Sequence, residues 1–492
     1  MHSSIKRKGL MVFFAGLAIL GFMAIDMSFA QLNSWVPTGS MSSARRDHTA
    51  TLLLNGKVLI IAGTADKSGV GQPAELYDPA SGLFESAGTT LFWHSQGSTA
   101  TLLEDGRVLI VGGWNAQTFA EIYDPVTGLF TATGTLGYPH CYHSATRLPD
   151  GRVLIAGGHS QGPPNYCPIT ENICEIFDPS LGTFMRVCDL NLARAGHTAT
   201  LLDDGRVLLT GGTYTFPDNP CHGDARNTAE LYDPASGTFS LIPMQVGRYG
   251  HTATKLMNGK ILIVGGPLYA DPSNLPYADI FDPGTNTFSP TGPMNIIHMT
   301  HTATLLLNGQ VLIAGGFSAA GPITRNIAEI YDPLSGQFSL TGNMTQPRQE
   351  HTATLLMDGR VLVAGGASGQ DVYHYATAEL YLAPSTPEDA IDQITEEIPP
   401  LPGSSEISLT IQLDEAMGKL QDARTFLKAG NLQLAKLRYC QSIEKVGVFI
   451  YNVQQKVPEL IAPETGQKLI ADAEILIDLI EKEMENAGLT PC

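Results

Sequence analysis

One sequence unit recurs seven times in the middle of the chain, and it constrains the fold more than any other feature. The first copy runs from His48 to Ile60, and successive copies are 45 to 54 residues apart. The first position of the copies is held by His48, Ser98, His143, His197, His251, His301 and His351. A repeat of this length is typical of a supersecondary unit that buries its core against neighbouring copies.

Each copy contains signals for four short strands, which we name A to D. An Asn-Gly or Asp-Gly pair separates two apolar runs and predicts an A–B hairpin with a two-residue type I′ turn, in which both residues have positive φ. The pairs begin at Asn55, Asp105, Asp150, Asp204, Asn258, Asn308 and Asp358. Apolar–polar alternation then marks strand C, and an Asp-Pro turn leads into strand D, which carries an aromatic residue such as Phe84.

Seven four-stranded units predict an all-β, seven-bladed β-propeller over residues 31–384. The units resemble the kelch repeat, in the bacterial form related to the central domain of galactose oxidase. The matching features are the glycine pair after strand B, as at Gly112 and Gly113, the Tyr-Asp-Pro sequence after strand C, and the aromatic residue of strand D. The resemblance covers residues 35–384.

The two ends of the repeat region look complementary. The seventh copy lacks a strand D, whereas Trp35 lies in a D-like segment that has no A, B or C strand before it. We therefore expect Trp35–Gly39 to pair with Ala378–Tyr381, complete the seventh blade and remove an exposed sheet edge.

The first 30 residues have the features of a cleaved export signal. Lys6, Arg7 and Lys8 precede an uncharged stretch over residues 10–25, and small residues at Ser28 and Ala30 suit a cleavage site. The alternative is an uncleaved anchor. We expect a secreted, periplasmic or cell-surface protein with no membrane segment beyond this signal. The net charge of −19 argues against a nucleic-acid partner, because phosphate contacts need a basic face.

The tail changes from a period of two to a helical period. Residues 385–405 are rich in Pro, Ser, Glu and Asp and indicate a linker. Residues 406–488 predict a three-helix module whose apolar stripes include Leu413, Tyr439 and Leu469. This module weakly resembles the FIMAH domains of some bacterial exported proteins.

Cysteines gather on one face of the predicted propeller. In a four-stranded meander the D–A and B–C loops emerge on the same face, which we call the loop face. Five of the seven cysteines fall in or beside these loops in blades 3 and 4. We favour disulfides Cys167–Cys174 and Cys188–Cys221, with Cys440–Cys492 as a candidate in the tail, although sequence alone does not fix connectivity. The alternative to disulfides is a zinc site formed by these cysteines, but no Cys-x-x-Cys pair supports it.

Two repeated sets of polar residues are best explained by structure. The strand-A histidines recur once per blade, which favours packing between blades over a metal site, because a ring spreads ligands apart. Three residues earlier lies a second set, which we expect at the channel mouth, paired with repeated acids such as Glu75: Arg45, Ser95, His140, Arg194, Arg248, His298 and Arg348. Ser95, His140 and His298, which replace arginine in this set, are candidates for a functional site.

One local match points to copper chemistry. Tyr142-His143 resembles the adjacent Tyr and His copper ligands of galactose oxidase, and blade 3 alone has Tyr before the strand-A His. In that family a Tyr crosslinked to a Cys and a His from an appended all-β domain complete the ligand set. Here the tail is helical and the match falls in the third blade.

Our main prediction is a non-enzymatic, exported binding or scaffold protein that needs no cofactor. Its partner would be a glycan or a protein held by the loop face, because exposed aromatic residues on variable loops suit such contacts. The alternative is an enzyme on the same face, either a copper radical oxidase or another sugar-modifying enzyme. The candidate binding residues are Trp93, His94, Trp114, His140, Tyr142, Tyr166, Tyr214 and Tyr373.

Overall fold

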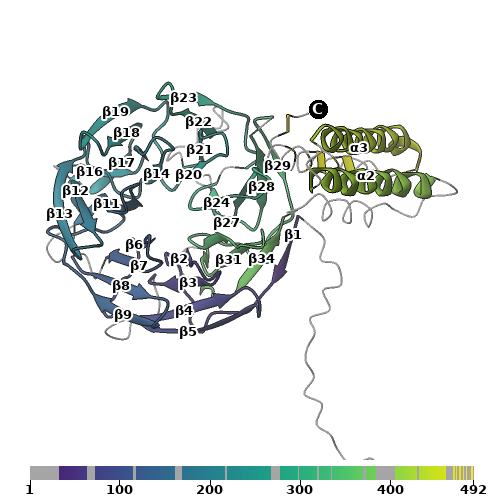
Figure 1. The fold of residues 1–492 in the computed structure, drawn as a ribbon. Helices are drawn as coiled ribbons and strands as arrows, with labels where there is room; N and C mark the ends of the chain where they lie inside the picture. The colour runs from purple at the N-terminus through teal and green to yellow at the C-terminus, as the bar shows by residue number, and fades with distance from the viewer. Residues whose placement is uncertain are drawn as a thin grey trace, which may run out of the picture. The chain divides into compact units, whose positions relative to one another are not determined.

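The repeat region folds into a closed ring of seven antiparallel sheets (Figure 1). The computed structural model describes residues 33–63, 72–114, 118–160, 169–216, 219–266, 278–296, 298–318, 321–333, 335–369, 373–383, 405–428, 432–460 and individual residues between 469 and 492. The predicted signal peptide lies outside these residues, and so does the predicted linker except for Ser405, which begins a helix. No described helix is long and apolar enough to cross a membrane.

Each of the first four blades is a four-stranded meander in chain order. Blade 1 contains β2 (Thr49–Leu52), β3 (Val58–Ile61), β4 (Pro73–Asp78) and β5 (Leu83–Thr89). Blade 2 contains β6 (Ser98–Leu102), β7 (Val108–Gly112), β8 (Ala120–Asp124) and β9 (Leu129–Ala132). Blade 3 contains β10 (Ser144–Arg147), β11 (Val153–Ser160), β12 (Ile169–Asp178) and β13 (Thr183–Asp189). Blade 4 contains β14 (Thr198–Leu201), β15 (Val207–Thr210), β18 (Thr228–Asp233) and β19 (Thr238–Pro243).

The remaining blades follow the same plan, and blade 7 takes its fourth strand from the start of the chain. Blade 5 contains β20 (Thr252–Lys255), β21 (Ile261–Val264), β22 (Ala278–Asp282) and β23 (Thr287–Pro290). Blade 6 contains β24 (Thr302–Leu305), β25 (Val311–Ala314), β28 (Ala328–Asp332) and β29 (Gln337–Leu340). Blade 7 contains β30 (Thr352–Leu355), β31 (Val361–Ala364), β34 (Ala378–Leu382) and β1 (Ser34–Pro37).

Three B–C loops form small hairpins of their own. They are β16 (Thr213–Phe216) with β17 (Asn219–Ala225) in blade 4, β26 (Phe317–Ser318) with β27 (Gly321–Thr324) in blade 6, and β32 (Ala367–Ser368) with β33 (Tyr373–His374) in blade 7. Backbone pairing gives these described parts of the loops a fixed shape on the loop face.

The expected ring closure is confirmed. Strand β1 pairs antiparallel with β34, with Trp35 opposite Tyr381. The Trp35 indole N–H donates to the carbonyl oxygen of Gly342 at 2.6 Å, and its ring lies 5.0 Å from that of Tyr381. The first strand of the propeller, β1, is therefore strand D of the blade in which the last strand, β34, is strand C.

The A–B hairpins differ from the predicted turn type. In blade 1 the Leu53 N–H donates to the Lys57 carbonyl, and Gly56 has φ of 83° while Asn55 does not have positive φ. This is a three-residue loop that ends on a left-handed glycine, a geometry that also suits hairpins. The Asn55 side-chain oxygen accepts from the Lys57 N–H at 3.0 Å, so the Asn or Asp is selected for this local bond.

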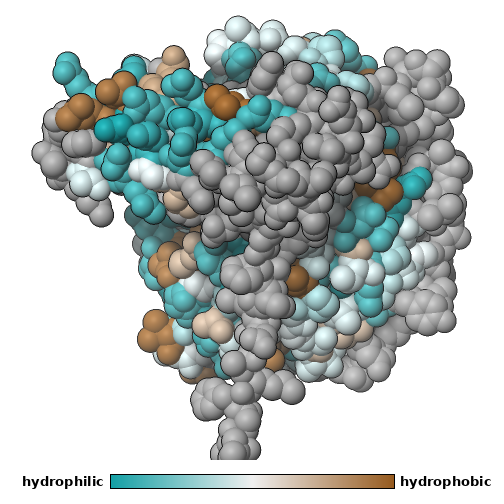
Figure 2. All heavy atoms as spheres, turned by 90° about the vertical axis from the view of Figure 1, so that its right-hand side faces the viewer, coloured by the Kyte–Doolittle hydropathy of each residue, from teal (hydrophilic) through white to brown (hydrophobic). Residues whose placement is uncertain are grey.

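The core consists of seven apolar layers, each between two neighbouring blades. In β3, Val58 and Ile60 pack in the layer toward blade 7, whereas Leu59 and Ile61 pack in the layer toward blade 2. Both faces of strand B are thus buried, which explains its continuous apolar sequence. Among the coloured residues of the face drawn in Figure 2, hydrophobic side chains form small separate groups between hydrophilic ones.

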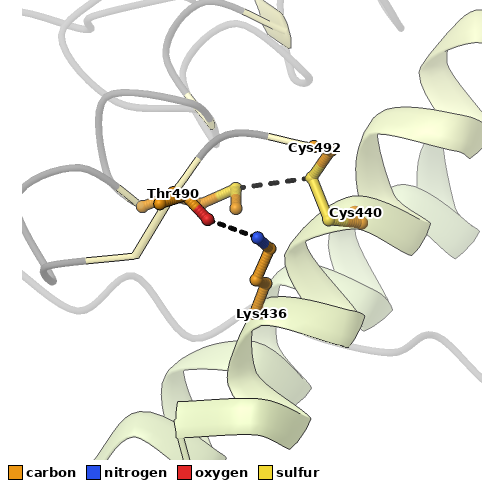
Figure 3. Close-up of a disulfide and its surroundings, with 5 residues drawn as sticks. Lys436, Cys440, Thr490 and Cys492 are labelled. Carbon is orange, nitrogen blue, oxygen red and sulfur yellow. Dashed lines mark hydrogen bonds between the residues drawn. A yellow bond between two sulfur atoms is a disulfide. The ribbon is translucent and has the colours of Figure 1, made fainter.

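The tail is helical, as predicted. Helix α2 (Ser405–Lys428) packs on α3 (Leu432–Leu460), and Leu413 and Tyr439 share a core with the helical residue Leu469. A disulfide joins Cys440 of α3 to Cys492, and the Lys436 ammonium donates to the Thr490 hydroxyl beside it (Figure 3). The tail disulfide is therefore confirmed.

Candidate functional site

A ring of buried ion pairs stabilises the loop face. Arg45 contacts Glu75, Arg194 contacts Glu230 and Arg348 contacts Glu379, at 2.9 to 3.0 Å. Arg248 pairs with Asp279 in the same way, and all four arginines are buried. Each pair links the segment before strand A to strand C of the same blade, so these residues are structural, as the repeat predicted.

Histidine takes the place of arginine in three blades. His140 and His298 each bond a carbonyl oxygen through Nδ1, at 2.8 and 2.6 Å, and a carboxylate through Nε2, at 3.1 and 3.2 Å. Each ring thus contacts a carbonyl oxygen and a carboxylate, the same two kinds of acceptor that the Arg194 guanidinium contacts in blade 4.

In blade 2 the structure corrects the predicted alignment. The equivalent residue is His94, not Ser95, because one extra residue precedes strand A. The His94 side chain is 0% exposed, its Nδ1 lies 2.7 Å from the Gly112 carbonyl oxygen and its Nε2 lies 2.9 Å from Glu121. His94, His140 and His298 are therefore engaged in buried pairs within their blades.

The strand-A histidines join neighbouring blades. The Nε2 atom of His143 lies 2.8 Å from the Thr99 hydroxyl, and His301 bonds Thr252 in the same way at 3.0 Å. Burial, with the charge of a neighbouring arginine second, lowers the pKa of His48 to about 3. These rings are thus neutral, and the expected inter-blade role is confirmed.

The residue just before each strand-A position has left-handed backbone in all seven blades. Three are glycines, and the other four are Asp47 (φ 51°), Tyr142 (φ 54°), Thr300 (φ 51°) and Glu350 (φ 55°). Backbone bonds connect them around the ring, for example from the Asp47 N–H to the Glu350 carbonyl at 3.1 Å. A non-glycine residue in this conformation costs of order 1–3 kcal/mol and is a pointer to function.

Side chains from four blades converge at this level. Tyr142 of blade 3 interacts electrostatically with Asp47 of blade 1, Tyr249 of blade 5 and Glu350 of blade 7. Blades 3 and 7 lie across the ring from each other, so these groups meet only near its axis (Figure 1). We call Asp47, Tyr142, Tyr249, Thr300 and Glu350 the axial cluster.

The axial cluster has unusual electrostatics. Burial, with the charge of Glu350 second, raises the pKa of Asp47 to about 7, and Arg46 opposes this shift. Arg46 instead pairs with Glu350 at 3.1 Å. No described residue forms a hydrogen bond or ion pair with the Asp47 carboxylate. Burial, followed by Glu350 and Asp47, also raises the pKa of Tyr249. A desolvated acid beside a second acid is typical of functional sites.

The predicted binding residues fall into separate groups. Trp93 and Trp114 of blade 2 are half-buried, and the Tyr214 ring of blade 4 stacks under the Arg226 guanidinium at 3.7 Å. Tyr142 alone of the set belongs to the axial cluster. Tyr166 and the side chain of Tyr373 lie outside the described part of the chain.

The favoured loop disulfides do not form as predicted. Cys174 on β12 and Cys188 on β13 are free thiols, and they are hydrogen-bonded to each other. They are neighbours within one blade, because a bulge after Ile173 shifts the pairing of these strands. Their predicted partners, Cys167 and the side chain of Cys221, lie outside the described residues. Cys141 is also a free, buried thiol.

Comparisons with known proteins agree with the fold. No protein-family model and no curated protein match the chain. Among solved structures, it is similar to a fungal alcohol oxidase of the AA5 family in complex with copper, with a TM-score of 0.58 and 17% identity over 71% of this chain and 76% of the oxidase. The protein is thus a seven-bladed β-propeller whose fold is similar to that of this oxidase.

At the position that matches the copper ligands, the His143 ring is engaged between two blades. The Nε2 atom of His143 is bonded to Thr99, the same kind of bond that the other strand-A histidines make. The groups that act on Tyr142 are the acids Asp47 and Glu350, the thiol of Cys141 and the phenol of Tyr249. Among the described residues, no three His, Cys, Asp or Glu side chains are placed to hold a metal ion.

Sequence reasoning found one member of the axial cluster and missed the others. The signal was nevertheless present, because Gly97, Gly196 and Gly250 occupy this position in three blades. A glycine in several copies of a repeat indicates positive φ, so Asp47 and Glu350 in the same position are exceptions that carry a cost.

Proposed function

We propose that this chain is an exported binding protein that recognises a glycan or a protein through the axial cluster on the loop face. The observation that carries the proposal is the convergence of Asp47, Tyr142, Tyr249 and Glu350 from four blades. Two carboxylates and two phenol rings are a small set of convergent polar and aromatic groups, which is the composition expected of a ligand site.

The backbone supports the same assignment. Four of the seven residues at the axial position adopt left-handed φ without being glycine, and a purely structural ring would use glycine throughout. Strain of this kind persists where the side chain has a use. Tyr249 is 37% exposed, so one ring of the cluster is accessible to a ligand.

The oxidase alternative has less support. It rests on the shared propeller and on Tyr142-His143, but the Nε2 atom of His143 is engaged by the Thr99 hydroxyl of the neighbouring blade. A binding function uses the residues that are present and needs no additional donor.

A glycan array and a panel of extracellular proteins, probed with the mature chain from residue 31, test the proposal. For any ligand found, Tyr249→Ala should weaken binding by about 30-fold, equivalent to about 2 kcal/mol for a central aromatic contact. Met357→Ala is a control, because Met357 lies on an A–B turn and is 63% exposed. If Met357→Ala abolished ligand binding and Tyr249→Ala left it unchanged, the site would lie on the opposite face, which would contradict the proposal. Copper uptake with oxidase activity would favour the alternative.

A further inference from the structure

We infer that the axial cluster binds a cationic group, namely the side chain of a lysine or arginine presented by a partner protein. This inference rests on the proposed function and specifies its ligand. The cluster offers Asp47 as a carboxylate that no described residue pairs with, beside the partly neutralised Glu350 and the rings of Tyr142 and Tyr249.

The negative charge of the cluster favours a cationic ligand over an anionic one. An anion would be repelled by both carboxylates, whereas a cation would offset the repulsion between Asp47 and Glu350. Phenol rings add to this preference, because the face of an aromatic ring attracts ammonium and guanidinium groups. The Thr300 hydroxyl oxygen is buried without a partner among the described residues and supplies a further polar contact for N–H donors.

The donor set favours an organic cation over a metal ion. Among the described residues, two carboxylates meet at the axis, and no group of three His, Cys, Asp or Glu could hold a metal. An ammonium or guanidinium group needs fewer anionic contacts and can use the rings, which suits two acids between two tyrosines.

The overall charge favours a basic protein as the source of the cation. The chain carries a net charge of −19, which attracts a basic partner at long range and orients it. A lysine or arginine head on a flexible stem can enter a site lined by one residue from each of several blades, whereas a polysaccharide would lie across the face.

Proton release gives the inference a distinct signature. Asp47 has to be ionised to pair with a cation, so affinity should increase as the pH rises through about 7. Between about pH 6 and about pH 8 the ionised fraction, and hence affinity, rises about tenfold. The charged and titratable groups that face Asp47 are Glu350, Arg46, Tyr142, Tyr249 and Cys141.

The experiment uses the full mature chain and small probes. Calorimetric titrations compare Nα-acetyl-arginine amide and Nα-acetyl-lysine amide with the neutral Nα-acetyl-citrulline amide and with glucosamine. We expect the arginine or lysine probe to bind, with release of a proton near neutral pH, and the citrulline probe to bind at least about tenfold more weakly. Equal binding of arginine and citrulline probes would overturn the inference. Tighter binding of glucosamine would overturn the choice of a protein side chain.

Two substitutions complete the test. Asp47→Asn removes the charge, and asparagine tolerates left-handed φ, so the fold should persist. The substitution should lower the affinity for the cationic probe at least about tenfold and abolish the pH dependence of that affinity. Asp358→Asn, on an A–B turn, is the matched control. Should Asp47→Asn fail to fold, Glu350→Gln is the second variant: without the neighbouring charge the pKa of Asp47 falls, so the pH dependence of binding should move to lower pH, and an unmoved pH dependence would overturn the inference. A neutral ligand that needs Tyr249 but not Asp47 would refute this inference and leave the proposed function standing.

Discussion

Trp35 provides a stringent test of how the ring is closed. It is 8% exposed, packs on Tyr381 and donates to the Gly342 carbonyl of blade 6. Truncating a buried aromatic to alanine costs about 3–5 kcal/mol, and the lost hydrogen bond adds about 1 kcal/mol. We therefore expect Trp35→Ala to lower the free energy of unfolding of the propeller by about 5 kcal/mol.

This loss can be converted to a melting temperature. The propeller spans residues 33–383, and unfolding entropy near 2.1 cal/mol/K per residue gives roughly 0.7 kcal/mol/K in total. A loss of about 5 kcal/mol then lowers Tm by about 7 °C. Differential scanning calorimetry of the full chain measures this shift for the propeller transition separately from that of the helical tail.

Two further variants separate the contribution of the Trp35 hydrogen bond from that of its ring packing and compare the closing blade with an ordinary one. Trp35→Phe keeps the ring and loses the indole N–H, so it should cost only about 1 kcal/mol. Phe130→Ala removes the equivalent, partly buried aromatic of blade 2, which packs on Tyr123 within an uninterrupted blade. A Tm shift below about 2 °C for Trp35→Ala would refute the reasoning, because the strand from the start of the chain would then contribute little to closure.

Three further predictions concern protons and thiols. Folding lowers the pKa of the strand-A histidines from 6.5, in three of them to about 3, so stability is full above about pH 6.5 and falls as the pH drops toward 3. Melting curves should show this fall, and His251→Gln should reduce it; an unchanged slope would contradict the role. Cys492→Ser opens a crosslink between residues 52 apart and should destabilise the tail by about 4 kcal/mol on the chain-entropy model; unaltered melting of the helices would disprove this. Oxidised glutathione should join Cys174 to Cys188 with loss of two hydrogen atoms, and peptide mapping that finds both thiols still free would count against their proximity.

Most of the fold could be predicted because its signals are local and repeated. An Asx-Gly pair between two apolar runs specifies a hairpin wherever it occurs, and seven copies give the blade number. The turn type was wrong because loops of two and three residues use the same Asx-Gly signal, and only the backbone distinguishes them. The alignment of Ser95 was wrong because a single inserted residue shifts His94 into the paired position.

Pairings between loops could not be predicted. The favoured partners of Cys174 and Cys188 lay in adjacent loops, where residue spacing suggested them. The structure places these two thiols on neighbouring strands of one blade, where a bulge adjusts the register. Register is set by packing on both faces of the sheet, which spacing along the chain does not reveal.

The sequence by itself determined the blade count, the strand order, the closure by Trp35 and the helical tail, because turn chemistry and apolar periodicity act over a few residues. Which residues form the axial cluster could be seen only in the tertiary structure. Asp47 and Glu350 are about 300 residues apart in the chain and become neighbours through ring closure. The unusual pKa of Asp47 is then a consequence of burial and of a second carboxylate, neither of which exists until the seven blades have met around one axis.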